Sequence, residues 1–229
     1  MKSFLLLFIL LISMNAFSGW DEAVDALNRS DFNTALQELK VLAEQGVPEA
    51  QYNLGQMYKN GQGTVQDNKV ALHWYLKAAK QGIVDAQYNS GIMYDKGQGT
   101  TQNFKAALHW YTKAAENGQV KAQYNLGGMY ANGQGTVQDN KAAFYWFAKA
   151  AEQGNADAQF NLGVLFVNGQ GTIQDVTRAH MWWNIAASNG HPGSEKYRNS
   201  IQKNMTASQI EKAQDLAREC VTKVYKDCY

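Results

Sequence analysis

The sequence predicts an all-α protein built from helix–loop–helix repeats, on three observations. Nearly the same string begins at residues 50, 86, 122 and 158, so the period is 36 residues. Within a copy, Ala50, Leu54 and Met57 recur with the spacing of one helical face. A Gly-Gln-Gly loop interrupts every copy. A fixed period of this length indicates a solenoid in which each helix pair packs against its neighbours.

The first 18 residues have the pattern of a secretory signal peptide. Lys2 supplies a positive start, an apolar run of 11 residues covers 4–14, and the small residues Ala16 and Ser18 precede a cut ahead of Gly19. A membrane anchor is the alternative, but 11 residues are too few to cross a bilayer as a helix. We therefore expect cleavage near Ser18-Gly19 and a mature protein in the periplasm or outside the cell.

Residues 19–49 predict a capping helix pair. Ala35, Leu39 and Gly46 keep the register of the later copies, but the Gly-Gln-Gly loop is missing and Ser30-Asp31-Phe32 stands in its place. Such a departure is expected at the end of a solenoid, where one side of the terminal unit has no neighbour.

Four repeats follow, at 50–85, 86–121, 122–157 and 158–193. In each one the glycines of the loop, residues 60–63 in the first copy, end a helix because glycine adopts left-handed backbone angles without steric cost. Asp67 or Asn68 can then cap the second helix. The Asn-Gly pair in this loop is typical of a hairpin between strands, but the flanking period is 3.6 rather than 2, so we reject strands.

The second helix of each repeat has its own apolar face and ends at a glycine. Two glycine series keep the 36-residue register, one at the ends of the second helices and one inside the first helices, where helices are expected to press together: Gly46, Gly82, Gly118, Gly154 and Gly190, then Gly55, Gly91, Gly127 and Gly163. Four tryptophans share the apolar face and are expected to be core residues: Trp74, Trp110, Trp146 and Trp182.

The motif A-x-Y-N-L-G-x-M-Y, the G-x-G loop, the segment A-x-x-W-Y-x-K-A-A and the closing glycine resemble the Sel-one-like repeat family. The resemblance covers residues 50–193. It implies a tetratricopeptide-like, right-handed α/α superhelical solenoid, in which one side of the first helices lines a concave surface.

Residues 194–229 predict capping helices. A degraded helix surrounds Tyr197, and a last helix begins at Thr206, which forms a capping box with Gln209. We expect the apolar face of this last helix to cover the final repeat with Ile210, Ala213, Ala217, Val221 and Val224.

Two cysteines, Cys220 and Cys228, lie near the C-terminus. A zinc site would need two further ligands, and His191 is the only nearby histidine. Along one straight helix the cysteines would be about 12 Å apart, so a disulfide requires the chain to turn back after Cys220. Secreted relatives of this repeat class, the cysteine-rich family from Helicobacter, join helices through the same spacing. The resemblance therefore implies a disulfide that fastens the C-terminal cap, with a reactive thiol as the alternative.

Charge and motifs point away from nucleic acid, metal sites and catalysis. Loss of Lys2 with the signal peptide leaves 20 of the 21 basic residues against 20 acidic ones, and a neutral chain without a basic run is not typical of nucleic-acid or membrane-surface binding. We find no nucleophile elbow, zinc-protease motif or phosphate loop. His73 and His109 are repeat-equivalent, but Tyr145 and Met181 replace them later, so we interpret them as partly exposed helix residues. We expect no enzymatic activity, no cofactor and no metal.

An aromatic residue recurs on the otherwise polar side of each first helix, beside an asparagine. By the resemblance, this side lines the concave surface, and its residues run from polar to apolar along the chain: Tyr52, Gln56, Lys59, Tyr88, Ile92, Asp95, Tyr124, Gly128, Ala131, Phe160, Val164 and Val167. Two interpretations stay open. The rings and the neighbouring amides can bind an extended peptide, with residues 92, 128 and 164 setting specificity, or they can pack and bridge adjacent repeats.

Three functions fit these observations. The leading hypothesis is a non-enzymatic periplasmic or secreted scaffold that binds protein or peptide partners on its concave surface, in cell-envelope assembly, signalling regulation or host interaction. The alternative is a cell-wall-directed ligand binder or a weak β-lactam-hydrolysing protein, as the resemblance to the cysteine-rich relatives implies. A structural spacer is the third.

Overall fold

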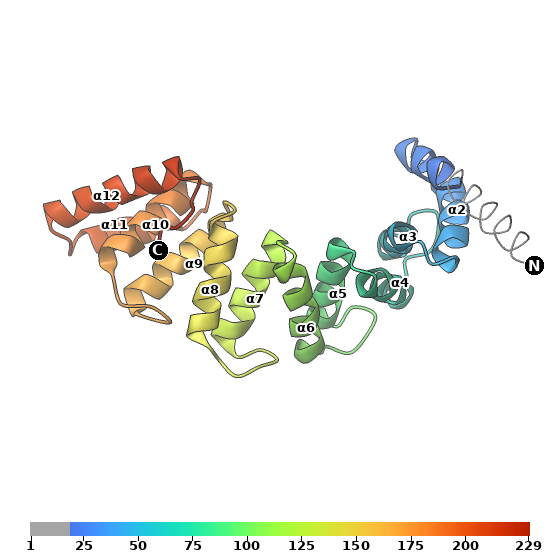
Figure 1. Cartoon of the computed structure of the whole chain (residues 1–229), viewed down its shortest axis with the longest axis horizontal. Coiled ribbons are helices and arrows are strands. Elements are labelled where there is room, and N and C mark those ends of the chain that lie inside the picture. Colours follow the sequence, from blue (N-terminus) through green and yellow to red (C-terminus); the bar gives the residue numbers. More distant parts are fainter. Residues whose placement is uncertain (1–18) are drawn as a thin grey trace, which may run out of the picture. The chain divides into compact units, whose positions relative to one another are not determined.

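The computed structural model describes residues 19–229, and the predicted signal peptide lies outside this range. The described residues form helices and no β-strand, which confirms the all-α prediction. Residues 19–28 are helical, and the labelled helices of Figure 1 are α2 (Phe32–Glu44), α3 (Pro48–Asn60), α4 (Asn68–Lys80), α5 (Val84–Lys96), α6 (Phe104–Glu116), α7 (Val120–Asn132), α8 (Asn140–Ala151), α9 (Ala156–Asn168), α10 (Val176–Ser188), α11 (Ser194–Gln202) and α12 (Ala207–Thr222).

The described residues form two compact units, 19–103 and 104–229. In the first unit α2 packs on α3, α3 on α4 and α4 on α5, and in the second unit the same succession joins α6 to α10. Within each unit these helices therefore pack on their neighbours in the sequence, as expected for a solenoid of helix pairs. At the C-terminal end, α11 and α12 both pack on α10, as the capping prediction requires.

Aspartates begin the second helices and glycines end the first ones. Asp67 caps α4 because its carboxylate accepts hydrogen bonds from the N–H groups of Lys69 (2.8 Å) and Val70 (3.0 Å). Asp139 and Asp175 cap α8 and α10 in the same way. The first helices end at glycines in the left-handed conformation: Gly61, Gly97, Gly133 and Gly169.

The second glycine of each loop lies against the preceding repeat. Gly63 has φ +67°, and a Cβ there would overlap the carbonyl oxygen of Phe32 at the start of α2. The same holds for Gly99 on Asn68, Gly135 on Phe104 and Gly171 on Asn140. A glutamine later in the loop fastens it to the first helix, as Gln66 Nε2 does by donating to the Lys59 carbonyl at 2.9 Å. The repeated loop sequence is thus explained by packing between repeats.

The glycines inside the first helices give room to one ring of the second helix. A Cβ on Gly55 would stand 2.7 Å from the ring of Tyr75, and one on Gly127 would stand 2.8 Å from the ring of Phe147. Gly163 is in the same relation to the indole of Trp183. The prediction that helices press together at these glycines is confirmed in these three repeats.

The buried ring of each second helix lies one residue after the predicted tryptophan. Trp182 is fully buried, as predicted, but the expectation of a core position is wrong for the three earlier tryptophans, which remain partly exposed: Trp74, Trp110 and Trp146. The buried rings are Tyr75, Tyr111, Phe147 and Trp183. One residue is a rotation of about 100° on a helix, and the apolar spacing alone did not distinguish the two positions.

A buried glutamine in each first helix bonds to its neighbours. Gln123 Nε2 donates to the Ala115 carbonyl at the end of α6 (3.1 Å), and its Oε1 accepts from Gln153 Nε2 after α8 (2.8 Å). Gln51 and Gln159 repeat this arrangement with the equivalent residues. These bonds join three successive helices, which explains the glutamine of the A-Q-Y motif.

The C-terminal cap follows the prediction in part. The Thr206–Gln209 capping box is present, and Ala213 and Ala217 are buried. The expected coverage by Val221 and Val224 is wrong, because these side chains are 49% and 64% exposed. The helix ends at Thr222, so these two valines lie at and beyond its last turn.

The predicted disulfide is confirmed. Cys220 and Cys228 are bonded, with their Cα atoms 5.5 Å apart, because the chain turns back after α12. Two tyrosines of the returning segment contact earlier residues of the second unit. The Tyr225 hydroxyl bonds to Asn189 Oδ1 (3.2 Å), and Tyr229 bonds to Glu152 while its ring meets the Phe144 ring edge-on.

Candidate functional site: the first-helix face

The twelve residues predicted to bind a partner lie on the first helices and are all half-buried. We call them the first-helix face. In the first unit they come from α3 (Tyr52, Gln56, Lys59) and α5 (Tyr88, Ile92, Asp95), and in the second unit from α7 (Tyr124, Gly128, Ala131) and α9 (Phe160, Val164, Val167).

In the first unit the ring of Tyr52 is held on both sides. It packs on Tyr75 with the ring centres 5.8 Å apart, and its hydroxyl accepts a hydrogen bond from Gln56 Nε2 at 2.9 Å. The hydroxyl also bonds to Asn89 on α5. Burial and the nearby Asp85 raise the pKa of Tyr52, so the hydroxyl stays protonated at neutral pH.

The second unit repeats this bridge between neighbouring first helices. Tyr124 packs on Phe147 at 5.8 Å and bonds to Asn161 on α9. Burial, with Asp157, raises the pKa of Tyr124. The recurring tyrosine and asparagine thus form a pair across adjacent repeats, and these contacts favour the packing interpretation for both residues.

The fourth aromatic residue, Phe160, is covered by the cap. His191 stacks on its ring at 4.2 Å, and Tyr197 meets it edge-on at 5.0 Å. Tyr197 is 36 residues after Asn161, so the tyrosine–asparagine pair of the repeats becomes an apolar pair of rings here. A phenylalanine suits this place because it has no hydroxyl that needs a partner.

The remaining positions differ in chemistry between the units. In the first unit they include Lys59 and Asp95, and burial raises the pKa of Asp95 against the opposite effect of Lys96. In the second unit they are small or apolar: Gly128, Ala131, Val164 and Val167. The side-chain contacts described above for the rings and asparagines do not account for this variation.

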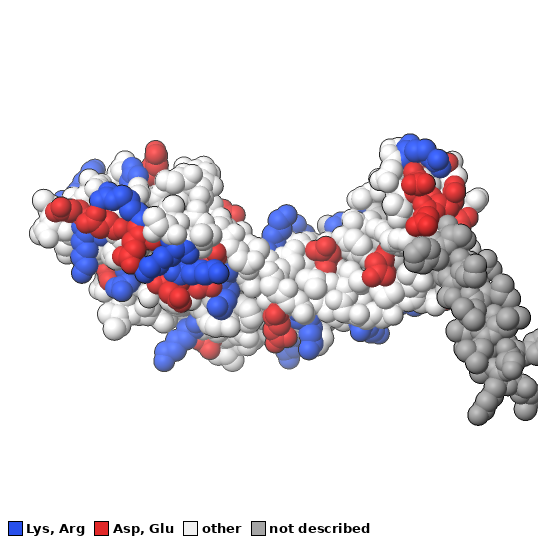
Figure 2. All heavy atoms as spheres, turned by 45° about the horizontal axis from the view of Figure 1, so that its top comes forward, with Lys and Arg blue, Asp and Glu red and all other residues white. Residues whose placement is uncertain are grey.

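Charged side chains are mixed in sign over the C-terminal helices. Figure 2 shows Lys, Arg, Asp and Glu side by side there, and α12 carries the ion pairs Arg218–Asp215 and Lys223–Glu219 (the latter at 2.6 Å). Alternating charges along a helix are typical of a solvated surface. On the face shown in Figure 2, the C-terminal helices therefore carry charges of both signs.

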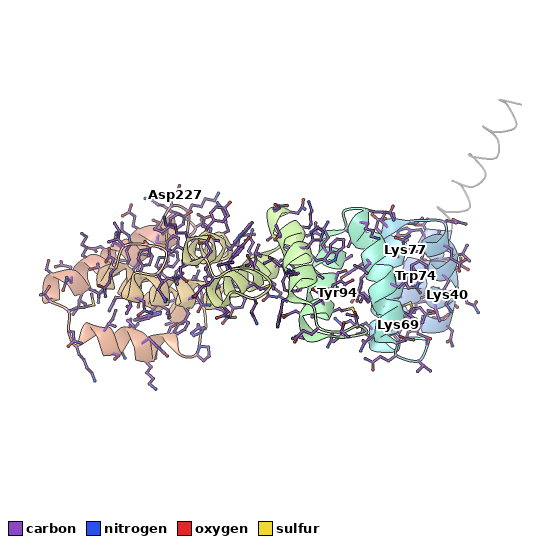
Figure 3. All side chains as sticks on the ribbon, turned by 90° about the horizontal axis from the view of Figure 1, so that it is seen from below. Lys40, Lys69, Trp74, Lys77, Tyr94 and Asp227 are labelled. Atoms are coloured by element: carbon purple, nitrogen blue, oxygen red, sulfur yellow. A yellow bond between two sulfur atoms is a disulfide. The ribbon has the colours of Figure 1, made fainter. Side chains whose placement is uncertain are left out.

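The partly exposed tryptophans of the second helices contact side chains of their own helix. Lys77 Nζ stands 4.5 Å from the ring centre of Trp74, and His73 meets this ring edge-on at 5.1 Å. Figure 3 labels Trp74 and Lys77 on α4 and Lys40 on α2. Lys40 itself stands 6.0 Å from the ring centre of Tyr58.

A serine, a histidine and an aspartate meet at the start of α11, which sequence analysis did not find. Ser194 Oγ is 2.8 Å from His191 Nδ1, and His191 Nε2 is 3.8 Å from Asp157 Oδ1. Ser194 is fully buried, and the Gly193 N–H also donates to His191 Nδ1. The serine hydroxyl is thus buried, and its contact with His191 lies at the first turn of α11.

The histidines differ in burial. His73 and His109 are exposed on second helices, whereas His180 is buried in α10. Among residues 19–229 no three His, Cys, Asp or Glu side chains are close enough to hold a metal ion. In the same range, no helix combines the length and apolarity that a membrane span requires.

A cavity of about 610 Å³ lies between α10 and α12. Ile185, Ala217 and Val221 contribute its apolar walls, and Asn184 and Arg218 are among its polar ones. None of the twelve predicted partner-binding residues lines it.

Comparison with known proteins identifies the repeat. The Sel1 repeat model matches residues 48–83, 84–119, 120–155 and 156–191, so each match begins two residues before the frame derived from the sequence. No curated protein is similar enough to match.

Two solved structures are similar over most of the chain. One is a Sel1 repeat protein from Oxalobacter formigenes, with 32% identity over 77% of this chain and 72% of that one, and a TM-score of 0.73. The other is a protective antigen of uropathogenic Escherichia coli with an SLR fold, with 34% identity over 85% of this chain and a TM-score of 0.74. This chain spans 42% of the length of that antigen. The four matched repeats cover more than half of the protein, and the chain belongs to the Sel1 repeat family.

Proposed function

We propose that this protein is an exported, non-enzymatic Sel1 repeat scaffold that binds a protein or peptide partner along its first-helix face. Its parts would be a signal peptide at 1–18, an N-terminal cap at 19–49, four repeats over 50–193 and a C-terminal cap at 194–229. The observation that carries the proposal is the pattern of variation. Residues that hold the loops, the core and the helix bridges recur from repeat to repeat, whereas residues 56, 92, 128 and 164 change chemistry at half-buried positions of the first helices in both units.

Export is supported by three features. The first 18 residues have a signal-peptide pattern, the two cysteines are bonded, and a disulfide persists best in an oxidising compartment. The similar protein from uropathogenic Escherichia coli is described as a protective antigen, which suits a location that the host can reach. Cell fractionation followed by intact-mass measurement tests this part, and an uncleaved cytoplasmic chain would contradict it.

The binding function is tested by crosslinking in the native cell envelope. Mature protein and a variant carrying Ile92→Arg and Val164→Arg would each be crosslinked, purified and analysed by mass spectrometry. We expect a partner to be recovered with the wild type and lost with the variant, because both substitutions place a charge on the first-helix face and leave the bonded rings intact. Circular dichroism of the variant checks that its helices are retained, and equal recovery of the partner would contradict the proposal.

The non-enzymatic part has its own test. The serine nearest to a histidine, Ser194, is buried, so we expect purified protein to give no turnover of a chromogenic β-lactam. Steady hydrolysis above the rate of a heat-denatured sample would favour the cell-wall-directed alternative.

A further inference from the structure

Gly128 lies within α7 on the first-helix face, and no packing contact requires a glycine there. Its backbone is helical, and a Cβ at this position would meet nothing within 4 Å. Gly127, the preceding residue, is in the opposite situation because the Phe147 ring occupies its side. Glycine destabilises a helix interior relative to alanine, and one recognised use for it is the close approach of another backbone or a ligand.

The first repeat shows what can occupy the place above Gly128. The equivalent residue there is Gln56, whose amide N–H donates to the Tyr52 hydroxyl at 2.9 Å. Tyr52 also bonds to Asn89, and Tyr124 forms the matching bond to Asn161. At Tyr124 the second donor is missing from the repeat, because glycine has no side chain to supply it.

The positions that follow Tyr124 on this face are uncharged, while Asp157 at the start of α9 lies close enough to Tyr124 to raise its pKa. Tyr124 bonds to Asn161 across α7 and α9, so Gly128 and Ala131 on α7 and Val164 and Val167 on α9 come on the following turns of the same two helices. No ionisable side chain occurs at these four positions, whereas the first unit has Lys59 and Asp95 at the equivalent places. Such a surface favours an apolar segment over a charged one, since a charge loses hydration there without gaining a partner.

We propose that an extended, uncharged peptide segment crosses α7 at Gly128, with one backbone N–H donated to the Tyr124 hydroxyl and an apolar side chain against Ala131 and Val164. This rests on the proposed function and names the chemistry of its partner. In the first repeat the side-chain amide of Gln56 donates to the equivalent tyrosine hydroxyl. Because Gly128 has no Cβ, a peptide main chain can approach the backbone of α7 more closely there than it could at any other residue type. Main-chain hydrogen bonds combined with apolar contacts to alternate side chains are a recurring mode of peptide recognition.

The test uses a peptide selected from a random phage-displayed library on immobilised mature protein. The selected peptide is synthesised and its affinity measured by fluorescence anisotropy for the wild type, Gly128→Gln and His109→Gln. The glutamine of Gly128→Gln can donate its side-chain amide to the Tyr124 hydroxyl, as Gln56 does to Tyr52 in the first repeat. It would then displace the peptide N–H, and we expect the affinity to fall by about tenfold or more, as for the loss of one hydrogen bond. His109→Gln places the same side chain on an exposed second helix of the same unit and should bind like the wild type.

Folding and binding are separated by a second series. Gly128→Gln should melt at the same temperature as the wild type or higher, because it removes a glycine from a helix. Methylating the peptide at one backbone nitrogen at a time should identify one position that weakens binding to the wild type by about tenfold and leaves the residual binding to Gly128→Gln unchanged.

Three results would overturn the inference. A peptide that binds Gly128→Gln as tightly as the wild type, yet is lost with Val164→Arg or Ile92→Arg, would leave the proposed function standing and remove Gly128 from it. A peptide for which no single N-methyl group matters would exclude the backbone donor. Failure of the wild type to enrich any peptide would count against both this inference and the proposed function.

Discussion

Adjacent glycines on one helix can serve different purposes, and Gly127 and Gly128 show this at the scale of single residues. A side chain at Gly127 would run into the Phe147 ring, whereas one at Gly128 would enter open space. The sequence predicted close packing at the series that contains Gly127, because this series recurs every 36 residues. The sequence could not show whether Gly128 packs against another residue. Neighbouring residues of a helix point about 100° apart, and only the packed structure shows what each one faces.

Alanine substitutions should therefore change stability in opposite directions. Gly127→Ala forces a Cβ to within 2.8 Å of the Phe147 ring and should lower the free energy of unfolding. The expected loss is about 1–3 kcal/mol, the usual cost of overpacking a core. Gly128→Ala should raise the free energy of unfolding by up to about 1 kcal/mol through helix propensity. Urea denaturation measures both, and two losses of equal size would contradict the assignment.

His180 is a buried histidine at a position where the other second helices have apolar residues. Its equivalents are Leu72, Leu108 and Phe144, and it is 2% exposed. Burial lowers the pKa of His180, and Arg198 on α11 lowers it further against a weak contact with Gln202. His180 in the unfolded chain therefore binds a proton at a higher pH than it does in the folded chain. As the pH falls below the ordinary pKa of histidine, the unfolded chain gains this proton first, and the folded state loses stability.

We therefore predict that His180 makes the protein less stable at acidic pH. The free energy of unfolding should fall from about pH 7 to pH 5, the range in which an ordinary histidine gains its proton, and His180→Phe should flatten this dependence. Denaturant titrations at several pH values measure the slope. An unchanged slope in the His180→Phe variant would show that other groups cause it.

At the scale of elements, the loops between the helices of each repeat are held in place by the repeat before them. The sequence predicted the glycines as helix ends, and this is confirmed by Gly61, Gly97, Gly133 and Gly169. The docking of the next glycine, Gly63 for example, on an earlier helix was not predictable, because it depends on how two repeats stack. The same reason hid the bridging function of the buried glutamines, whose partners are up to 30 residues away.

Two loop glycines with similar backbone angles should differ in their tolerance of alanine. Gly118 has φ +83° and open space around a Cβ, so Gly118→Ala should cost only the strain of the left-handed backbone, about 1 kcal/mol. Gly135 has φ +74° and also faces the backbone of Phe104 and Lys105, so Gly135→Ala should cost several times more. Thermal unfolding of the two variants compares them, and equal losses would mean that docking adds nothing to the strain.

For the whole molecule, the 36-residue period was sufficient to predict the fold class and the helix pairs of the repeats. It was not sufficient for the candidate site. The tyrosines and asparagines that a surface pattern marks as binding residues bond to one another across neighbouring repeats. Tyrosine and asparagine are suited both to binding a ligand and to bonding between repeats. Only the distances between the helices distinguish these two functions.

The disulfide should stabilise the C-terminal end of the second unit. Cys220 and Cys228 are eight positions apart, and closing a loop of this size contributes about 2–3 kcal/mol in the chain-entropy model. We expect reduction, or the double change Cys220→Ser and Cys228→Ser, to lower the melting temperature and to increase hydrogen exchange in residues 223–229. The double variant should be insensitive to reductant, and protection of the tail without the disulfide would show that the Tyr225 and Tyr229 contacts suffice.

The docking of each loop on the previous repeat gives the array a direction of assembly. Gly63 rests on the start of α2 and Gly171 on the start of α8, and the buried glutamines Gln51 and Gln159 likewise reach back to carbonyl groups of the preceding helix. In each of these contacts the later segment packs on, or donates to, a helix that precedes it in the sequence. Synthesis begins at the N-terminus, so the earlier helices are available before the segments that pack on them. Each repeat would then fold onto a finished surface, with the N-terminal helix pair as the seed of the series.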